Sequence, residues 1–270
     1  MKIALSNIAW DPAENEAVAG IMKEYNVTSL EVAPTKLWNT PENATDADIQ
    51  LSKEWWEKRG IQIVSGQSLL YGHPELELFV SEENRNQTFE YLSKIIQVCG
   101  KLGAKALVFG SPKNRQLHKL TPHEGMEIAV DFFHRLGQVA QDAGTCVVLE
   151  PNPPHYFCDF IQTAAEGVEL VKQVNHAGFR LHLDAAAMTL NEEPYAKTIE
   201  ASFPWLKHFH ASEPNLQLLG SGKTDHPQIA AVLKSLGYEG FVSVEMKGGL
   251  LTPNTKAVET ALHVITNIYG

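Results

Sequence analysis

The chain has 270 residues, with 22 Lys and Arg against 32 Asp and Glu, so its formal charge is −10. Hydrophobic residues make up 44% and charged residues 20%, which excludes a disordered or collagen-like chain. The acidic balance disfavours nucleic acid and anionic membranes as partners, since both select clustered Lys and Arg. At this length, one α/β barrel of roughly 250 residues is as reasonable as two smaller domains.

The cysteines and the N-terminal segment predict a cytoplasmic protein. Three cysteines without a C-x-x-C pair are typical of a reducing compartment and do not suggest a disulfide framework. The first residues lack the apolar stretch of a signal peptide, and no apolar run approaches the roughly 20 residues of a membrane helix. We therefore expect a soluble, cytoplasmic protein.

Short apolar, β-branched segments alternate with helical stretches along the whole chain. They predict eight strands: Ile3–Ile8, Ser29–Ala33, Ile61–Ser65, Ala106–Gly110, Val147–Glu150, Phe179–Asp184, Leu206–His210 and Phe241–Glu245. The spacing of about 34 residues per strand leaves room for one helix in each crossover, as parallel strands require.

Helix starts are marked by capping residues. Asp11 and Thr121 each precede a proline, and Thr163 opens a capping box with Glu166. No linker or charge block interrupts the pattern. We therefore predict a single (β/α)8 TIM-barrel domain over residues 1–270; an open doubly wound sheet is the alternative, because barrel closure cannot be read from sequence.

Four consecutive predicted strands end in a residue that can bind a divalent metal ion: Glu150, Asp184, His210 and Glu245. The active site of a TIM barrel lies at the C-terminal ends of its strands, so these side chains should converge. Three carboxylates and one imidazole suit Mn²⁺, Mg²⁺ or Co²⁺ better than structural zinc, although zinc stays open. A single acidic residue at a strand end is more often a helix cap, but four such strands in succession favour a metal site.

The chain resembles the xylose isomerase-like TIM-barrel sugar isomerases and epimerases. The segments that carry the resemblance are Val147–Asn152, Leu181–Asp184, His208–Glu213 and Val242–Met246. The resemblance implies that Glu150, Asp184, His210 and Glu245 bind one divalent metal ion and that Glu150 and Glu245 form the acid/base pair. Two such groups on opposite faces of a carbon next to a carbonyl can invert its configuration.

Two departures from the family pattern concern the substrate. The ketose 3-epimerases of the family carry a histidine three residues after the metal-binding aspartate, where this chain has Ala187. They also carry an arginine six residues after the metal-binding histidine, where this chain has Leu216. Both differences argue against 3-epimerisation of a free ketohexose and leave the isomerase or epimerase class intact.

Two loops at the predicted active-site face offer substrate contacts. Lys113 and Arg115 follow the fourth strand and could bind a carboxylate or phosphate, unless this is merely a solvated basic loop. Asn152, with His155 and Asp159, follows the fifth strand in a proline-stiffened loop that could form one wall of the pocket.

For the histidines among the remaining candidates, a purely structural role is the alternative to a role in the site. His182 and His208 lie two residues before a proposed ligand, so they should face the barrel interior one layer below it, either supporting the ligands or packing in the core. His226 could contact substrate or bind a second metal, although helix capping by Asp225 also explains its segment. Trp10 could stack on a sugar. Asn7, Glu31 and Gln67 are weaker candidates from the first three strands.

The sequence therefore predicts a metal-dependent isomerase or epimerase of a sugar or sugar derivative. Its partner would be a small carbohydrate, either neutral or anionic, and homo-oligomerisation stays open. A metal-dependent dehydratase is the alternative that shares the proton abstraction. An endonuclease IV-like phosphodiesterase is disfavoured by the charge and by the lack of histidines at the ends of strands two to four, and a silent sugar-binding barrel has no positive support.

Overall fold

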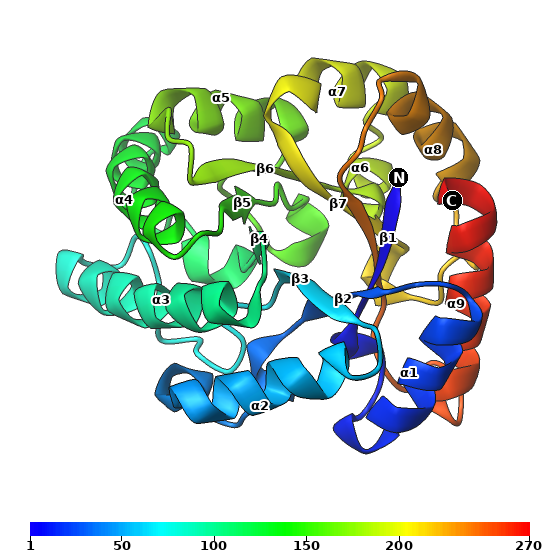
Figure 1. Cartoon of the computed structure of the whole chain (residues 1–270). Helices are drawn as coiled ribbons and strands as arrows, with labels where there is room; N and C mark the ends of the chain where they lie inside the picture. Colours follow the sequence, from blue (N-terminus) through cyan, green and yellow to red (C-terminus); the bar gives the residue numbers. More distant parts are fainter.

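The computed structural model describes residues 1–270 and contains a closed barrel of eight parallel strands. The strands are β1 Lys2–Ser6, β2 Ser29–Val32, β3 Gln62–Gly66, β4 Ala106–Phe109, β5 Val147–Leu149, β6 Phe179–Asp184, β7 Leu206–Ser212 and β8 Phe241–Glu245. Each strand pairs with the next along the chain, and β1 closes the barrel by pairing in parallel with β8 (Figure 1). The TIM-barrel prediction is confirmed, and closure excludes the open sheet.

A ring of helices surrounds the strands (Figure 1). The helices are α1 Asn15–Glu24, α2 Asp46–Glu57, α3 Glu82–Leu102, α4 Pro122–Asp142, α5 Ala164–Val174, α6 Ala185–Leu190, α7 Tyr195–Ser202, α8 His226–Ser235 and α9 Asn254–Tyr269. Helices α1 and α9 pack side by side where β1 and β8 close the barrel. None of the helices combines the length and apolar composition needed to span a membrane.

The predicted helix starts follow the capping chemistry. Thr121 and Thr163 accept hydrogen bonds from the backbone N–H groups of Glu124 and Glu166, and both capping boxes are complete. Asp11 instead opens a short 3-10 turn, Pro12–Glu14, that leads into α1.

Several strand ends differ from their predicted positions by one or two residues. Strand β1 stops at Ser6 because Asn7–Ala9 turns into a 3-10 helix, and the Asn7 side chain accepts a hydrogen bond from the Ala33 N–H at 2.7 Å. Strand β5 ends one residue before Glu150, whereas β7 continues two residues beyond His210. These differences leave the predicted metal-binding residues at the same end of the barrel.

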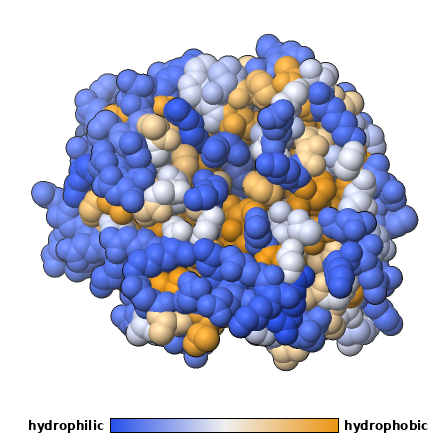
Figure 2. Space-filling view, viewed as in Figure 1, coloured by the Kyte–Doolittle hydropathy of each residue, from blue (hydrophilic) through white to orange (hydrophobic).

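Most buried apolar side chains from strands and helices form one contiguous core, and a second cluster of four residues lies at β4 and β5. The barrel interior also contains polar groups that are almost completely buried, among them Glu31, His182 and His208. On the outer surface, hydrophilic residues dominate the periphery of the face in Figure 2, and apolar residues gather toward its middle. Buried polar groups need hydrogen-bond partners, so the contacts of these interior residues indicate where a functional site lies.

Candidate active site

Three of the four predicted metal ligands form a tight cluster. Asp184 and Glu245 end β6 and β8, and His210 lies two residues before the end of β7; their ligand atoms all lie within 4.8 Å of one another. His210 Nδ1 lies 3.3 Å from Glu245 Oε2 and 4.0 Å from Asp184 Oδ2, and it is buried without a hydrogen-bond partner. The fourth residue, Glu150, lines the same pocket but lies outside this three-residue cluster.

Asp184 is both a helix cap and a carboxylate of the site. Its Oδ1 atom accepts a hydrogen bond from the Ala187 N–H at 2.6 Å, which caps α6, and its Oδ2 atom accepts one from the Ser212 hydroxyl. The two interpretations of this residue from the sequence therefore do not exclude each other, since capping orients the carboxylate toward His210.

The carboxylates repel one another. Burial, the repulsion from Glu245 and that from Asp184 raise the pKa of Glu150 to about 8, and burial with Glu245 raises the pKa of Asp184 to about 6. A divalent cation would offset this excess of negative charge. The oxygen-rich donor set and the unpartnered His210 nitrogen fit such an ion.

A buried carboxylate on β2 holds His210 from the opposite side. Glu31 accepts hydrogen bonds from His210 Nε2 at 2.8 Å and from His208 Nε2 at 2.6 Å, with further donors from Gln67 at 3.0 Å and Ser243 at 3.3 Å. Because a carboxylate only accepts, Nε2 of His210 must carry a proton, and Nδ1 is the atom left to face Asp184 and Glu245.

Charge within this network reinforces the arrangement. Burial alone would raise the pKa of Glu31, but His210 and His208 outweigh it and hold that pKa well below the usual range. Burial alone would lower the pKa of His210, but Glu31 and Glu245 raise it well above its ordinary value. The ionised carboxylate and the two imidazoles thus stabilise one another in the buried interior of the barrel.

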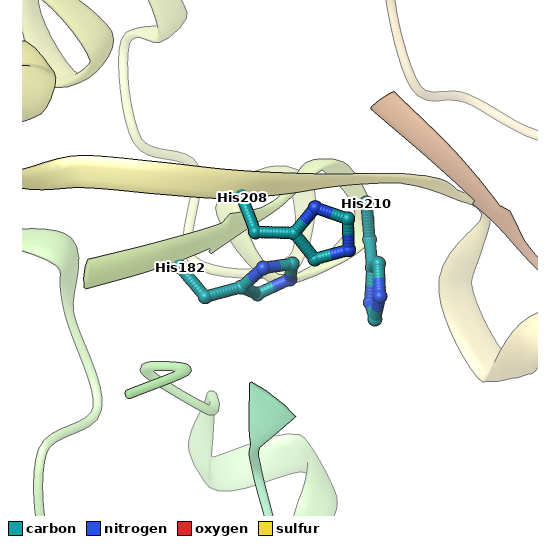
Figure 3. A group of neighbouring side chains, drawn as sticks. All are labelled: His182, His208 and His210. Carbon is teal, nitrogen blue, oxygen red and sulfur yellow. The ribbon is translucent and has the colours of Figure 1, made fainter. Parts of the chain in front are cut away.

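His182 lies beside this network and has no hydrogen-bond partner. Its ring centroid lies 4.1 Å from that of His210 and 5.3 Å from that of His208, and the three rings gather beside β6 and β7 (Figure 3). His182 is fully buried and does not line the pocket. Burial and the neighbouring imidazoles lower the pKa of His182 well below its ordinary value. It lies one layer below the cluster, as its register with Asp184 predicts, and packs against His210 there.

A pocket of about 450 Å³ opens above the cluster. Glu150, Asp184 and Glu245 line it together with residues from the loops after β3, β4, β5 and β7. Half of the ten residues other than glycine with positive φ line this pocket: Ser68, Ser111, Phe157, Asn215 and Leu216. Such conformations are costly for residues with a Cβ and concentrate at functional sites, which supports this pocket as the site of function.

Of the candidate substrate contacts, Lys113, Asn152, His155 and the weaker candidate Gln67 line the pocket. Lys113 lies at its exposed mouth, and Asn152 lies beside Glu150 and donates to that residue's backbone oxygen at 3.2 Å. Arg115 does not line the pocket: it is fully buried, and its guanidinium donates to the Glu150 backbone oxygen at 2.8 Å. Arg115 therefore helps to position the backbone of Glu150.

Trp10 and His226 lie away from the pocket lining. Trp10 is buried, and its indole N–H donates to Asn15 at 2.7 Å. His226 is buried between Tyr269, whose hydroxyl lies 2.8 Å from Nδ1, and Glu213, whose Oε1 lies 3.4 Å from Nε2. Neither side chain can reach a ligand in this pocket without a rearrangement; Asp225 caps α8, as the structural alternative predicts.

Two residues that shape the site, Ser212 and Gly110, were not predicted from the sequence. Ser212 follows His210 by two residues on β7, so period-two alternation could have placed it on the same face. Gly110 leaves room for the Glu150 carboxylate, because a Cβ there would lie 2.6 Å from Glu150 Oε2 and would displace it. No local pattern predicts that contact, since it arises between two neighbouring strand ends.

Comparison with known proteins identifies the family. Residues 20–268 match the model of the xylose isomerase-like TIM barrel. The chain belongs to this family. The family assignment made from the four strand-end motifs is thereby confirmed, and it applies to nearly the whole barrel.

Individual relatives within the family are sugar epimerases. The chain is 30% identical to a D-psicose 3-epimerase of Ruminiclostridium cellulolyticum over 48% of this chain and 45% of the relative, and 34% identical to one of Agrobacterium fabrum over 45% and 39%. The matched segments thus span less than half the length of these curated relatives. A crystal structure of D-psicose 3-epimerase with D-tagatose from Clostridium cellulolyticum H10 superposes with a TM-score of 0.82 at 20% identity, covering 100% of this chain and 99% of the other.

Proposed function

We propose that this protein is a divalent-metal-dependent epimerase or isomerase of a sugar or sugar derivative. The observation that carries the proposal is the convergence of Asp184, His210 and Glu245 at one end of the barrel, with Glu150 lining the same pocket. The epimerase relatives described above add support, and they favour epimerisation over dehydration of the substrate.

The four residues Glu150, Asp184, His210 and Glu245 would hold the metal ion, which we propose to be Mn²⁺, Mg²⁺ or Co²⁺ because the donors are mostly oxygen. A bound divalent ion polarises a substrate carbonyl and stabilises negative charge on its oxygen. Glu31 holds the imidazole of His210, and Ser212 with the N-terminus of α6 holds the carboxylate of Asp184.

Glu150 and Glu245 would exchange the proton on the carbon next to the carbonyl. They enter the pocket from β5 and β8, which are separated by β6 and β7, so they can approach a bound sugar from different sides. One carboxylate removes the proton, and the other, protonated, returns a proton to the opposite face, which inverts the configuration. Asn152 and Lys113 would contact the sugar oxygens.

The cytoplasmic location stays a prediction; the three cysteines are free and buried.

Product analysis tests this proposal. Metal-loaded protein is incubated with a panel of ketoses and keto-glycosides, and the products are separated by chromatography and weighed by mass spectrometry. The proposal predicts a product of unchanged mass that elutes as an epimer or isomer, and Glu150→Gln or Glu245→Gln should abolish it. A product lighter by one water would refute epimerisation in favour of the dehydratase.

A further inference from the structure

The mouth of the pocket differs in chemistry from its acidic interior. Lys113 supplies the only Lys or Arg side chain in the lining, and its ammonium group lies 5.5 Å from the centre of the Phe157 ring. Phe157 also lines the pocket, yet 68% of its surface is exposed. An exposed aromatic ring that lines a pocket offers a flat apolar face on which a ligand can stack, and the neighbouring cation can bind polar groups of the same ligand.

The backbone holds Phe157 in this position. Its φ of 63° lies in the left-handed region, a costly conformation for a bulky side chain. Its N–H donates to the Pro154 carbonyl at 2.9 Å, and its carbonyl accepts from the Gln116 side chain at 2.9 Å, which links it to the loop after β4. The exposed ring is therefore built into the mouth by two loops.

The loop after β7 also lines the mouth and is hydrogen-bonded to the loop after β5 that carries Phe157. The 3-10 turn η6, Pro154–Tyr156, follows β5, and the turn η8, Pro214–Leu216, follows β7. The Asn215 N–H donates to the Tyr156 hydroxyl at 3.0 Å, and the Asn215 side chain lies 3.1 Å from His155 Nε2. Both Asn215 and Leu216 have positive φ, so the loops after β5 and after β7 each contribute strained residues to the mouth.

We propose that this mouth is a subsite for a second sugar ring, so that the substrate is a glycosylated keto sugar and not a free monosaccharide. The inference rests on the proposed function, because the keto sugar would occupy the inner part of the pocket beside Glu150 and Glu245. The apolar face of the second ring stacks on Phe157, and its hydroxyl groups reach Lys113 and Asn215. A pocket of 450 Å³ lies within the range of roughly 300–1,000 Å³ that encloses ligands larger than one hexose.

The interaction with an aromatic ring favours a sugar over a small anion as the occupant. Stacking removes the exposed Phe157 surface from water, whereas a phosphate would use Lys113 alone and leave the ring in solvent.

Binding of matched ketoses tests the subsite. Calorimetry on the metal-loaded protein compares D-fructose with two glycosyl fructoses, isomaltulose and lactulose, and with fructose 6-phosphate. We expect at least one glycosyl fructose to bind about tenfold more tightly than fructose and more tightly than the phosphate. Phe157→Ala should reduce that preference to within twofold, whereas Leu51→Ala, which removes a side chain of similar exposure (67%) outside the pocket, should preserve it.

Three results would overturn the subsite: no preference for either glycosyl fructose, a preference that survives Phe157→Ala, or tightest binding of the phosphate, which would make the mouth an anion site. Proton exchange in D₂O is followed separately on the same samples. Preferential binding without exchange would refute the proposed function and leave the subsite standing, so the two failures are distinguishable.

Discussion

Replacement of Glu31 by glutamine tests whether the interior network prepares His210 for a metal ion. Glu31 accepts from His210 at 2.8 Å and from His208 at 2.6 Å, and it lies on a strand remote in sequence from the metal cluster. Glutamine keeps the shape and one acceptor oxygen, but it removes the negative charge and places an amide donor against a neighbouring donor. Loss of such a partner typically weakens metal affinity 10- to 100-fold, which is about 1.4–2.8 kcal/mol.

The assay is isothermal titration of metal-free protein with Mn²⁺, with circular dichroism as a check on folding. Ser243→Ala serves as the control, because it removes only the 3.3 Å bond to Glu31 and should change the affinity less than about threefold. If folded Glu31→Gln binds Mn²⁺ within twofold of the wild type, Glu31 does not position the ligand and our account of the interior is wrong.

Three further predictions concern the carboxylates. Glu150→Gln and Glu245→Gln should each lower turnover by at least about 100-fold with the fold intact, because each removes one member of the acid/base pair. Near-wild-type turnover in either variant would exclude the two-carboxylate mechanism. Gly110→Ala should lower turnover at least about tenfold while the thermal midpoint changes little, because its Cβ would displace the flexible end of Glu150; unchanged turnover would show that the carboxylate position is not critical. The metal-free protein should lose stability as the pH rises from about 5 to 8. In the folded state the pKa values of Glu150 (about 8) and Asp184 (about 6) exceed those in the unfolded chain. The folded state therefore binds more protons than the unfolded state in this pH window. Thermal denaturation at pH 5 and at pH 8 measures this change in stability, and Mn²⁺ should make the change smaller. A higher thermal midpoint at pH 8 than at pH 5 without metal would contradict the raised pKa values of these two carboxyl groups.

The architecture was predictable because it depends on local signals. Apolar strand segments, threonine caps and regular spacing are all short-range features, and Thr121 and Thr163 start helices where their capping boxes predict. The strand ends were less certain because tertiary contacts decide them: the Asn7 side chain binds the Ala33 backbone and helps to end β1 early. Closure between β1 and β8 depends on contacts between the two ends of the chain, which no local pattern reports.

The metal cluster was predictable for a related reason. In a parallel barrel, the C-terminal ends of all strands meet at one face, so Asp184, His210 and Glu245 converge once the strands are assigned. The surroundings were harder to predict, because each contact joins loops or strands that are distant in sequence. Arg115 was expected at the substrate and instead binds the Glu150 backbone, whereas Glu31 was only a weak candidate and instead holds His210.

Deuterium exchange at the carbon next to the substrate carbonyl tests the central claim most directly. The protein, loaded with Mn²⁺ or stripped by a chelator, is incubated in D₂O with the ketose that it binds most tightly, and the sugar is followed by NMR. Our account predicts deuterium at that carbon in both epimers with the metal-loaded protein and none with the stripped protein. Epimers formed without deuterium, or exchange that continues after the metal has been removed, would contradict it.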